Sequence, residues 1–394
     1  CVPSRIGKMF FEPVVVPAET IFDFLAHEHN RSKFMTTFQI HRTIKFAACT
    51  GASLFALSIL SVSPAKADDC LLDRDNDGVV DAATDNDGGA NSNNDDSSTA
   101  CGVGANTGTA AFATAIGSNS NATADRTVAV GRLADATAAD ATALGHNADA
   151  TGASSLAVGQ SAISSALNAV AVGQSAQASA ESAVALGQSS AASATGAVAL
   201  GSDATSSQAG GIAIGQNANA SGPSTTNTLF ASVAVGVNTT AVDNATAIGN
   251  NAIARFSGTA TPLVSGINSA VAIGANAVAV GSNTIAIGTT ARAGTGFALN
   301  SPGADVLAGS NITVVGGRAE ANANNATALG ADSNVSGASG TAVGATSQAT
   351  ADFTTAVGHN ARASDFVTTA VGQGSQAIGF AATAYGQASF AQGN

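Results

Sequence analysis

Apolar and polar positions alternate in a short motif that recurs along most of this chain. The segment 127–131 reads TVAVG, and other copies keep the order of alanine, an aliphatic residue and glycine. Alternation with a period of two places Val128 and Val130 on one face of a strand, and Thr127 and Ala129 on the other. Polar residues and then small residues follow the glycine. Each repeat therefore predicts two short strands joined by tight bends, with glycine supplying backbone freedom at one bend.

The glycine of the motif returns every 14 residues in two uninterrupted runs. A fixed short period indicates supersecondary units that stack on their neighbours, so we expect an all-β fold, a parallel β-roll (solenoid) of about 19 short turns. The glycines in register are Gly117, Gly131, Gly145, Gly159, Gly173, Gly187, Gly201 and Gly215, and then Gly316, Gly330, Gly344, Gly358, Gly372 and Gly386.

The two faces of the repeat lead to an expectation about assembly. We expect the larger aliphatic residues to fill the inside of the roll, although about two per turn make a thin core against the entropy of ordering each turn. The alanine row would then face outward and allow another copy to approach closely; the alternative is that alanine lines a tight bend within one chain. The threonine that lies three residues before the glycine in the last six copies is expected to point inward. These residues are Thr313, Thr327, Thr341, Thr355, Thr369 and Thr383.

Composition and charge exclude several classes of protein. The chain has 44 glycines, no tryptophan, one tyrosine and 10% charged residues, so it lacks the large side chains that fill a wide globular core. All four lysines precede residue 68. From Asp68 onward, 7 arginines stand against 22 acidic residues, a net charge of −15. Such a surface offers no electrostatic attraction for nucleic acid or for an anionic membrane.

The N-terminal part has the layout of an export signal. Residues 1–34 carry no repeat and start with cysteine, and we interpret them as an extension upstream of a start at Met35. Residues 35–67 contain a basic start, an apolar run from Phe46 to Val62 and an A-x-A site that ends at Ala67. This order is typical of a cleaved signal peptide, whereas a transmembrane helix would be longer and more apolar. We therefore expect secretion.

An acidic segment at residues 68–101 precedes the repeats. Asp73, Asp75, Asp77 and Asp81 follow a D-x-D-x-D-G-x-x-D pattern, which suits the oxygen ligands of Ca²⁺. Position 12 of the loop is Thr84 and not glutamate, so a complete EF-hand is not supported. The alternative is a solvated tract of Asp, Asn and Ser that leads into the repeats.

Cysteine usage suggests one disulfide. Cys70 and Cys101 would be the two cysteines left after processing, and in an oxidising compartment they would close a disulfide around the acidic segment. Two unpaired thiols are the alternative.

No catalytic constellation stands out in the sequence, and we expect no enzymatic activity. His146 and His359 each follow a repeat glycine and are interpreted as variation within the repeat. Three longer spacings, at 216–231, 250–267 and 289–310, predict loops that serve recognition or are neutral insertions.

The repeats as a whole resemble those of a known family. The units Ser232–Gly236 (SVAVG), Ala197–Gly201 (AVALG) and Ser269–Gly274 (SAVAIG) resemble the S-V-A-I-G signature in the heads of YadA-like trimeric autotransporter adhesins, over residues 102–394. The resemblance implies a left-handed β-roll, a homotrimer, and adhesion to host matrix, host cells or sister bacteria from the outer-membrane surface.

Departures from the family pattern leave other functions open. Neither a heptad stalk nor anchor strands are apparent, so we expect the membrane anchor to be absent from this chain. A free secreted solenoid, such as an ice-binding or surface-structural protein, is the alternative function. Ice binding needs threonine outward, which the expected inward orientation disfavours.

Overall fold

The computed structural model describes residues 88–93, 97–222, 231–255, 269–294 and 310–393. Contacts divide the chain into two units, Cys1–Ser63 and Pro64–Asn394, and every described residue belongs to the second. The extension at 1–34 and the signal peptide at 35–67 lie outside the described residues. The same holds for most of the acidic segment, including its four candidate calcium ligands.

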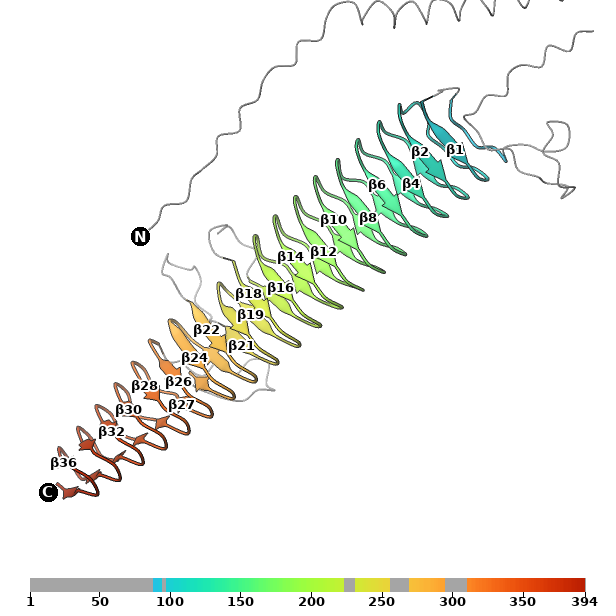
Figure 1. Cartoon of the computed structure of the whole chain (residues 1–394). Helices are drawn as coiled ribbons and strands as arrows, with labels where there is room; N and C mark the ends of the chain where they lie inside the picture. The colour runs from blue at the N-terminus through green and yellow to red at the C-terminus, as the bar shows by residue number, and fades with distance from the viewer. Residues whose placement is uncertain (1–87, 94–96, 223–230, 256–268, 295–309, 394) are drawn as a thin grey trace, which may run out of the picture. The chain divides into compact units, whose positions relative to one another are not determined.

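The described part folds as a parallel β-solenoid of two sheets, and it contains no helix. The first sheet has 19 strands, and the second sheet is built from the strands that alternate with them along the chain. Figure 1 shows the strands in stacked turns from β1 to β36. The predicted all-β parallel solenoid is therefore confirmed, with about 18 turns.

The first sheet holds the signature motif. Its strands are β1 (Thr99–Cys101), β2 (Thr114–Ile116), β4 (Val128–Val130), β6 (Thr142–Leu144), β8 (Leu156–Val158), β10 (Val170–Val172), β12 (Val184–Leu186), β14 (Val198–Leu200), β16 (Ile212–Ile214), β18 (Val233–Val235), β20 (Thr246–Ile248), β22 (Ala270–Ile273), β24 (Thr284–Ile287), β26 (Thr313–Val315), β28 (Thr327–Leu329), β30 (Thr341–Val343), β32 (Thr355–Val357), β34 (Thr369–Val371) and β36 (Thr383–Tyr385).

The second sheet has shorter strands. They are β3 (Asn121–Ala122), β5 (Asp135–Ala136), β7 (Asp149–Ala150), β9 (Ile163–Ser164), β11 (Gln177–Ala178), β13 (Ala191–Ala192), β15 (Thr205–Ser206), β17 (Asn219–Ser221), β19 (Thr240–Val242), β21 (Ile253–Arg255), β23 (Val278–Val280), β25 (Arg292–Ala293), β27 (Glu320–Ala321), β29 (Asn334–Val335), β31 (Gln348–Ala349), β33 (Arg362–Ala363), β35 (Gln376–Ile378) and β37 (Phe390–Gln392).

One turn shows how the repeat folds. After β4 the chain bends at Gly131, runs through β5, bends again and enters β6, which pairs with β4 in parallel. The N–H of Gly145 donates to the carbonyl of Val130 at 2.8 Å, one turn back. A second bend residue, Asp140, has a left-handed φ of 62°. Asparagine, aspartate and glycine tolerate this conformation best, which accounts for their frequency at the bends.

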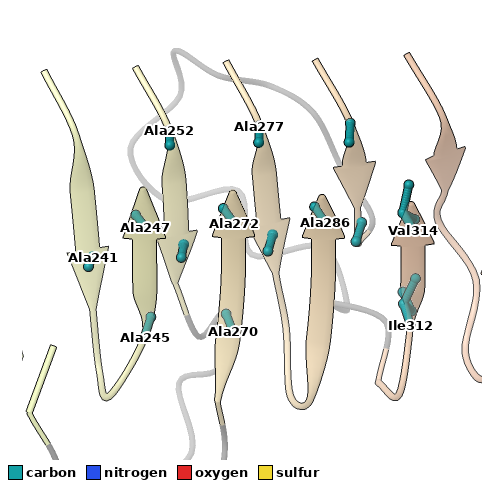
Figure 2. Close-up of a cluster of buried hydrophobic side chains, with 14 of the residues drawn as sticks. Ala241, Ala245, Ala247, Ala252, Ala270, Ala272, Ala277, Ala286, Ile312 and Val314 are labelled. Carbon is teal, nitrogen blue, oxygen red and sulfur yellow. The ribbon is translucent and has the colours of Figure 1, made fainter. Parts of the chain in front are cut away.

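The inside of the solenoid is filled by alanine. In Figure 2 the alanine side chains point into the space between the two sheets, together with Ile312 and Val314. Ala129 is fully buried, and Thr127 is buried on the same face, whereas Val128 and Val130 point outward and are half-buried. The alternation was predicted correctly, but the assignment of its two faces was wrong.

The small width of the turn explains this reversal. Each turn brings two strands and two bends around one interior, and that interior receives about four small side chains, such as Ala134, Ala136, Ala141 and Ala143. Protein interiors pack at close to crystal density, so Val or Leu at all of these positions would overfill the turn. Hydrophobicity favours the larger residues inside, but volume decides the outcome.

Buried hydroxyl groups occupy the corners of the interior, and most of them are hydrogen-bonded there; Oγ of Ser92 and of Ser155 are the exceptions among the described residues. Thr354 Oγ1 donates to the carbonyl of Ala351 at 2.6 Å, and Ser190 Oγ donates to the carbonyl of Gly187 at 2.9 Å. Each bond runs from the end of a bend back to its start, so the hydroxyl group finds its acceptor within the bend. Burial of these polar groups therefore carries little penalty.

The three long spacings do not interrupt the sheets. Ile212 pairs with Val233, Thr246 with Val271, and Ile285 with Thr313, each in parallel register. The ladder of the first sheet therefore continues across all three spacings.

Candidate assembly and interaction surfaces

The outer face of the first sheet is the most apolar surface of the described turns. Two columns of aliphatic side chains follow the sheet, one on each side of the buried alanine, and parallel register aligns them from turn to turn. Leu186 and Ile116 remain 40% and 41% exposed, and Tyr385 is 68% exposed. Contiguous exposed apolar area of this kind marks an interaction site.

One column of this face changes character along the chain. From Leu156 to Ile285 it is mostly aliphatic, and from Thr313 to Thr383 it consists of threonine. The threonines in the last six turns are half-buried or exposed on the outer face, so the prediction that they point inward was wrong. They stand where earlier turns carry valine, and those valines also point outward.

The outer face of the second sheet is more polar and contains a stack of acidic residues. Asp135 and Asp149 are register partners on β5 and β7. Asn121 Nδ2 donates to Asp135 Oδ1 at 2.6 Å, whereas Oδ1 of Asp149 is buried without a hydrogen-bond partner. Partial burial and the charge of Asp135 raise the pKa of Asp149.

Bends of successive turns are linked by polar ladders. Arg126 reaches Asp140 one turn ahead, and Arg318 reaches Asp332 in the same way; each arginine donates from two nitrogens. The hydrogen bond from Arg126 lowers the pKa of Asp140. Since all four side chains are exposed, these pairs contribute little to stability.

Neither histidine singled out in the sequence belongs to a metal site in the described part. His146 Nε2 lies 2.6 Å from a guanidinium nitrogen of Arg132, so it takes part in the same kind of ladder between turns. His359 is exposed at a bend. Within the described residues, no group of three or more His, Cys, Asp or Glu is arranged to hold a metal ion.

The predicted calcium and disulfide residues fall mainly outside the described part. Asp73, Asp75, Asp77 and Asp81 are among the residues without a description, so calcium binding stays a prediction. Cys101, at the end of β1, is disulfide-bonded. Its predicted partner Cys70 is not described, and the pairing therefore also stays a prediction.

Sequence reasoning missed a cluster of aromatic residues on the bends of the last turns. The rings of Phe353 and Phe366 are 5.6 Å apart in an edge-to-face arrangement, and those of Phe366 and Phe380 are stacked at 5.9 Å. Phe366 and Phe380 are one repeat apart, which is a signal that the sequence offered. Phe353 is one residue out of this register, and this offset conceals the ladder.

No helix in the described ranges is long and apolar enough to cross a membrane. The family model for the YadA head domain repeat (2 copies) matches the chain repeatedly, and no curated protein matches it. The matched residues are 109–134, 136–162, 164–190, 192–218, 206–226, 268–291, 313–333 and 336–361. Each of these matches falls on turns with the alanine interior and at least one outer aliphatic column, apart from the few matched residues that have no description. The repeats of this chain therefore belong to the YadA head family, and the chain carries a YadA-like head domain.

Proposed function

We propose that this chain is the head of a secreted bacterial cell-surface adhesin, which assembles as a homotrimer through the outer face of its first sheet. The observation that carries the proposal is the apolar outer face of that sheet, where one aliphatic column follows the turns and a second, mostly aliphatic column lies beside it from Leu156 to Ile285. The YadA-like head domain supports an adhesive role, because adhesins of this family form homotrimers and bind surfaces. The role is one of binding, without catalysis.

The magnitude of the exposed apolar surface favours assembly. Full burial of a valine or leucine side chain is worth roughly 1.5–3 kcal/mol, so covering the exposed third of one gives about 0.5–1 kcal/mol. The first sheet has 19 strands, most of them with one or two such side chains outward. The sum is of order 20 kcal/mol, whereas association costs roughly 4–15 kcal/mol in lost freedom of motion. Self-association through this face is therefore favourable.

Charges introduced on each sheet test this interface. Leu186→Glu combined with Leu200→Glu places two charges on the aliphatic columns, while Gln177→Glu with Ala191→Glu adds two charges to the outer face of the second sheet. We expect sedimentation of the full chain to give a trimer, which the first pair dissociates and the second pair leaves intact. A monomeric parent chain, or dissociation by the second pair alone, would refute the proposal.

Adhesion itself is tested separately. The proposed partners are host extracellular matrix, a host cell-surface receptor or other bacterial cells. We expect the full chain to bind immobilised matrix or cultured cells, or to aggregate cells that display it, and the dissociated variant to bind more weakly through loss of multivalency. A trimer that binds none of these surfaces would leave the assembly intact as a conclusion and exclude the adhesive role.

The outward threonine column supports a second candidate, a free secreted solenoid that binds ice. In-register parallel strands repeat every ~4.8 Å, so the hydroxyl and methyl groups from Thr313 to Thr383 form a regular row. This candidate predicts thermal hysteresis in a solution of the full chain, reduced by Thr341→Leu with Thr355→Leu. Freezing without hysteresis would exclude it.

We also propose that the acidic segment binds Ca²⁺ through Asp73, Asp75, Asp77 and Asp81, and that Cys70 pairs with Cys101. Carboxylate oxygens around a turn glycine support the first proposal. Cleavage after Ala67 would leave both features at the start of the mature protein. A chelator should then increase proteolysis of residues 68–110, and unchanged protease resistance would argue against calcium.

A further inference from the structure

Three phenylalanines form an exposed ladder on the bends that lead from the second sheet to the first. Phe353 lies between β31 and β32, Phe366 between β33 and β34, and Phe380 between β35 and β36. Their exposed fractions are 56%, 42% and 60%, and each ring contacts the next along the ladder. No other ring–ring contacts occur among the described residues, so the cluster distinguishes the last turns from the other described turns.

The fold does not require aromatic residues at these positions. Two turns before Phe366 the same type of bend carries Ala338 and Ser339, and Ser339 adopts a left-handed φ of 55°. Phe353 adopts a φ of 57°, and Val367, at the same position one turn later, adopts a φ of 61°. Bulky and β-branched residues are true outliers in this region and cost roughly 1–3 kcal/mol each. Phe353 therefore combines an unfavourable backbone conformation with exposure to water, and its ring contacts the exposed ring of Phe366; these features point to a role in binding.

Two carboxylates accompany the ladder. Asp352 and Asp365 directly precede Phe353 and Phe366, and both are exposed. Oδ1 of Asp352 accepts the N–H of Ala338 at 2.7 Å, and Oδ1 of Asp365 accepts the N–H of Phe366 at 2.8 Å. These bonds fix one oxygen of each carboxylate at the bends that carry the rings.

A cation is the chemical group that fits both components. The face of a phenyl ring attracts ammonium and guanidinium groups within about 6 Å, and a carboxylate beside it adds a charge-assisted hydrogen bond. The chain itself supplies few such groups. From Asp68 onward it has no lysine and 7 arginines against 22 acidic residues, and Arg126 and Arg318 are already paired with aspartate.

We propose that Phe353, Phe366 and Phe380, with Asp352 and Asp365, form a docking surface for a basic polypeptide segment. Arginine or lysine side chains of the partner lie over the phenyl faces, and their N–H groups donate to the two carboxylates. The proposal rests on the proposed adhesive function and deepens it by naming the chemistry of one partner.

A second copy of this chain is a poorer occupant of the surface. It would bring another Asp352 and Asp365 against the first pair, and like charges brought together oppose association. It would supply no lysine from its repeats. The apolar face of the first sheet, rather than these bends, carries the residues suited to contact between copies.

The test measures binding of fluorescent octa-arginine to the full chain at about 0.15 M salt, where charges beyond about 8 Å are screened. The main variant combines Phe353→Ser, Phe366→Ala and Phe380→Ala, and a second variant combines Asp352→Asn with Asp365→Asn, which keeps both Oδ1 acceptors. Leu167→Ala is the matched control, because Leu167 is an exposed apolar residue at the corresponding bend of a distant turn. Octa-glutamine is the control peptide, and sedimentation of the same samples reports assembly.

We expect about tenfold weaker octa-arginine binding in the triple phenylalanine variant, several-fold weaker binding in the aspartate variant, and no change with Leu167→Ala. Equal binding by the triple variant, equal binding of octa-glutamine, or no binding by the parent chain would overturn the proposal. Loss of the trimer in the triple variant without peptide binding by the parent would assign the ladder to self-association instead. A monomeric parent that still binds octa-arginine through these residues would refute the proposed trimer and leave the docking surface standing.

Discussion

The signature glycine predicts a large difference between two Gly→Ala substitutions in neighbouring turns. Gly173 ends the β10 motif with φ of 137°, and a Cβ added there would lie 2.5 Å from the carbonyl oxygen of Gly187 in the next turn. Gly196 lies at the other bend with φ of 65°, and a Cβ there would meet nothing within 4 Å. Ser182, one turn earlier, adopts φ of 56° at the corresponding position, so a side chain is tolerated there.

The magnitudes follow from these two environments. At Gly173 the backbone strain costs about 1–3 kcal/mol, and the contact with a neighbouring backbone adds about 1–3 kcal/mol or more, because a backbone oxygen cannot move aside without disturbing the ladder. At Gly196 the left-handed conformation costs about 1–2 kcal/mol, and the lower entropy of the unfolded chain returns about 0.4–1 kcal/mol. The expected difference in local stability is therefore about 3 kcal/mol.

Hydrogen exchange by mass spectrometry checks this prediction turn by turn, which suits a repeat array that need not unfold in one step. Peptides covering the turns on either side of Gly173 should exchange about a hundredfold faster in Gly173→Ala, while those around Gly196 should change by less than about tenfold in Gly196→Ala. Similar exchange in the two variants would show that the glycine is not required by the close approach of turns.

Three further predictions concern the interior and the acidic stack. Ala185→Leu, inside β12, should destabilise the solenoid by about 1–3 kcal/mol or more through overpacking. Leu186→Ala, on the outer face, should leave the urea midpoint of the isolated chain nearly unchanged. If Leu186→Ala were the more destabilising of the two, aliphatic residues and not alanine would fill the interior. Val335→Ala should cost about 1–2 kcal/mol, because it leaves a cavity at a fully buried position, as thermal unfolding would show. Asp149→Asn should stabilise the protein by up to about 1 kcal/mol at pH 7, since it removes a half-buried charge beside Asp135. The pKa of Asp149 is raised in the folded state, so folding favours its protonated form. The stability gained by Asp149→Asn should therefore vanish below the ordinary pKa of about 3.8 and grow as pH rises through the raised value. A gain that does not change with pH would contradict this prediction.

The sequence predicted the repeat but not the direction in which it faces. The period of 14 residues, the two strands per turn and the alternation within 127–131 all follow from local pattern, and the structure confirms them. Which face lies inside depends on the distance between two sheets, and that distance is a property of the closed turn as a whole. The alanine interior therefore could not be derived from hydrophobicity alone.

Candidate sites were predictable only where one residue type marks them. Aspartates in a calcium-like pattern are visible in the sequence, whereas the phenylalanine ladder depends on how bends of successive turns are aligned. Phe353 and Phe366 are 13 residues apart, one less than the repeat, yet their rings touch. A bend places neighbouring positions close together, so an offset of one residue still allows contact.

The reversal of the two faces moves the proposed contact between copies from an alanine row to the aliphatic face of the first sheet. This strengthens the case for assembly. An outward alanine row would have left little apolar surface for a partner to cover, because alanine gains little from burial. Outward valine, leucine and isoleucine leave the most hydrophobic part of the chain in contact with water. The solenoid cannot turn these side chains inward, since Ala129 and its equivalents already fill the turn. Only another surface can cover them, and in the proposed trimer the other two copies would present surfaces with the same spacing of turns.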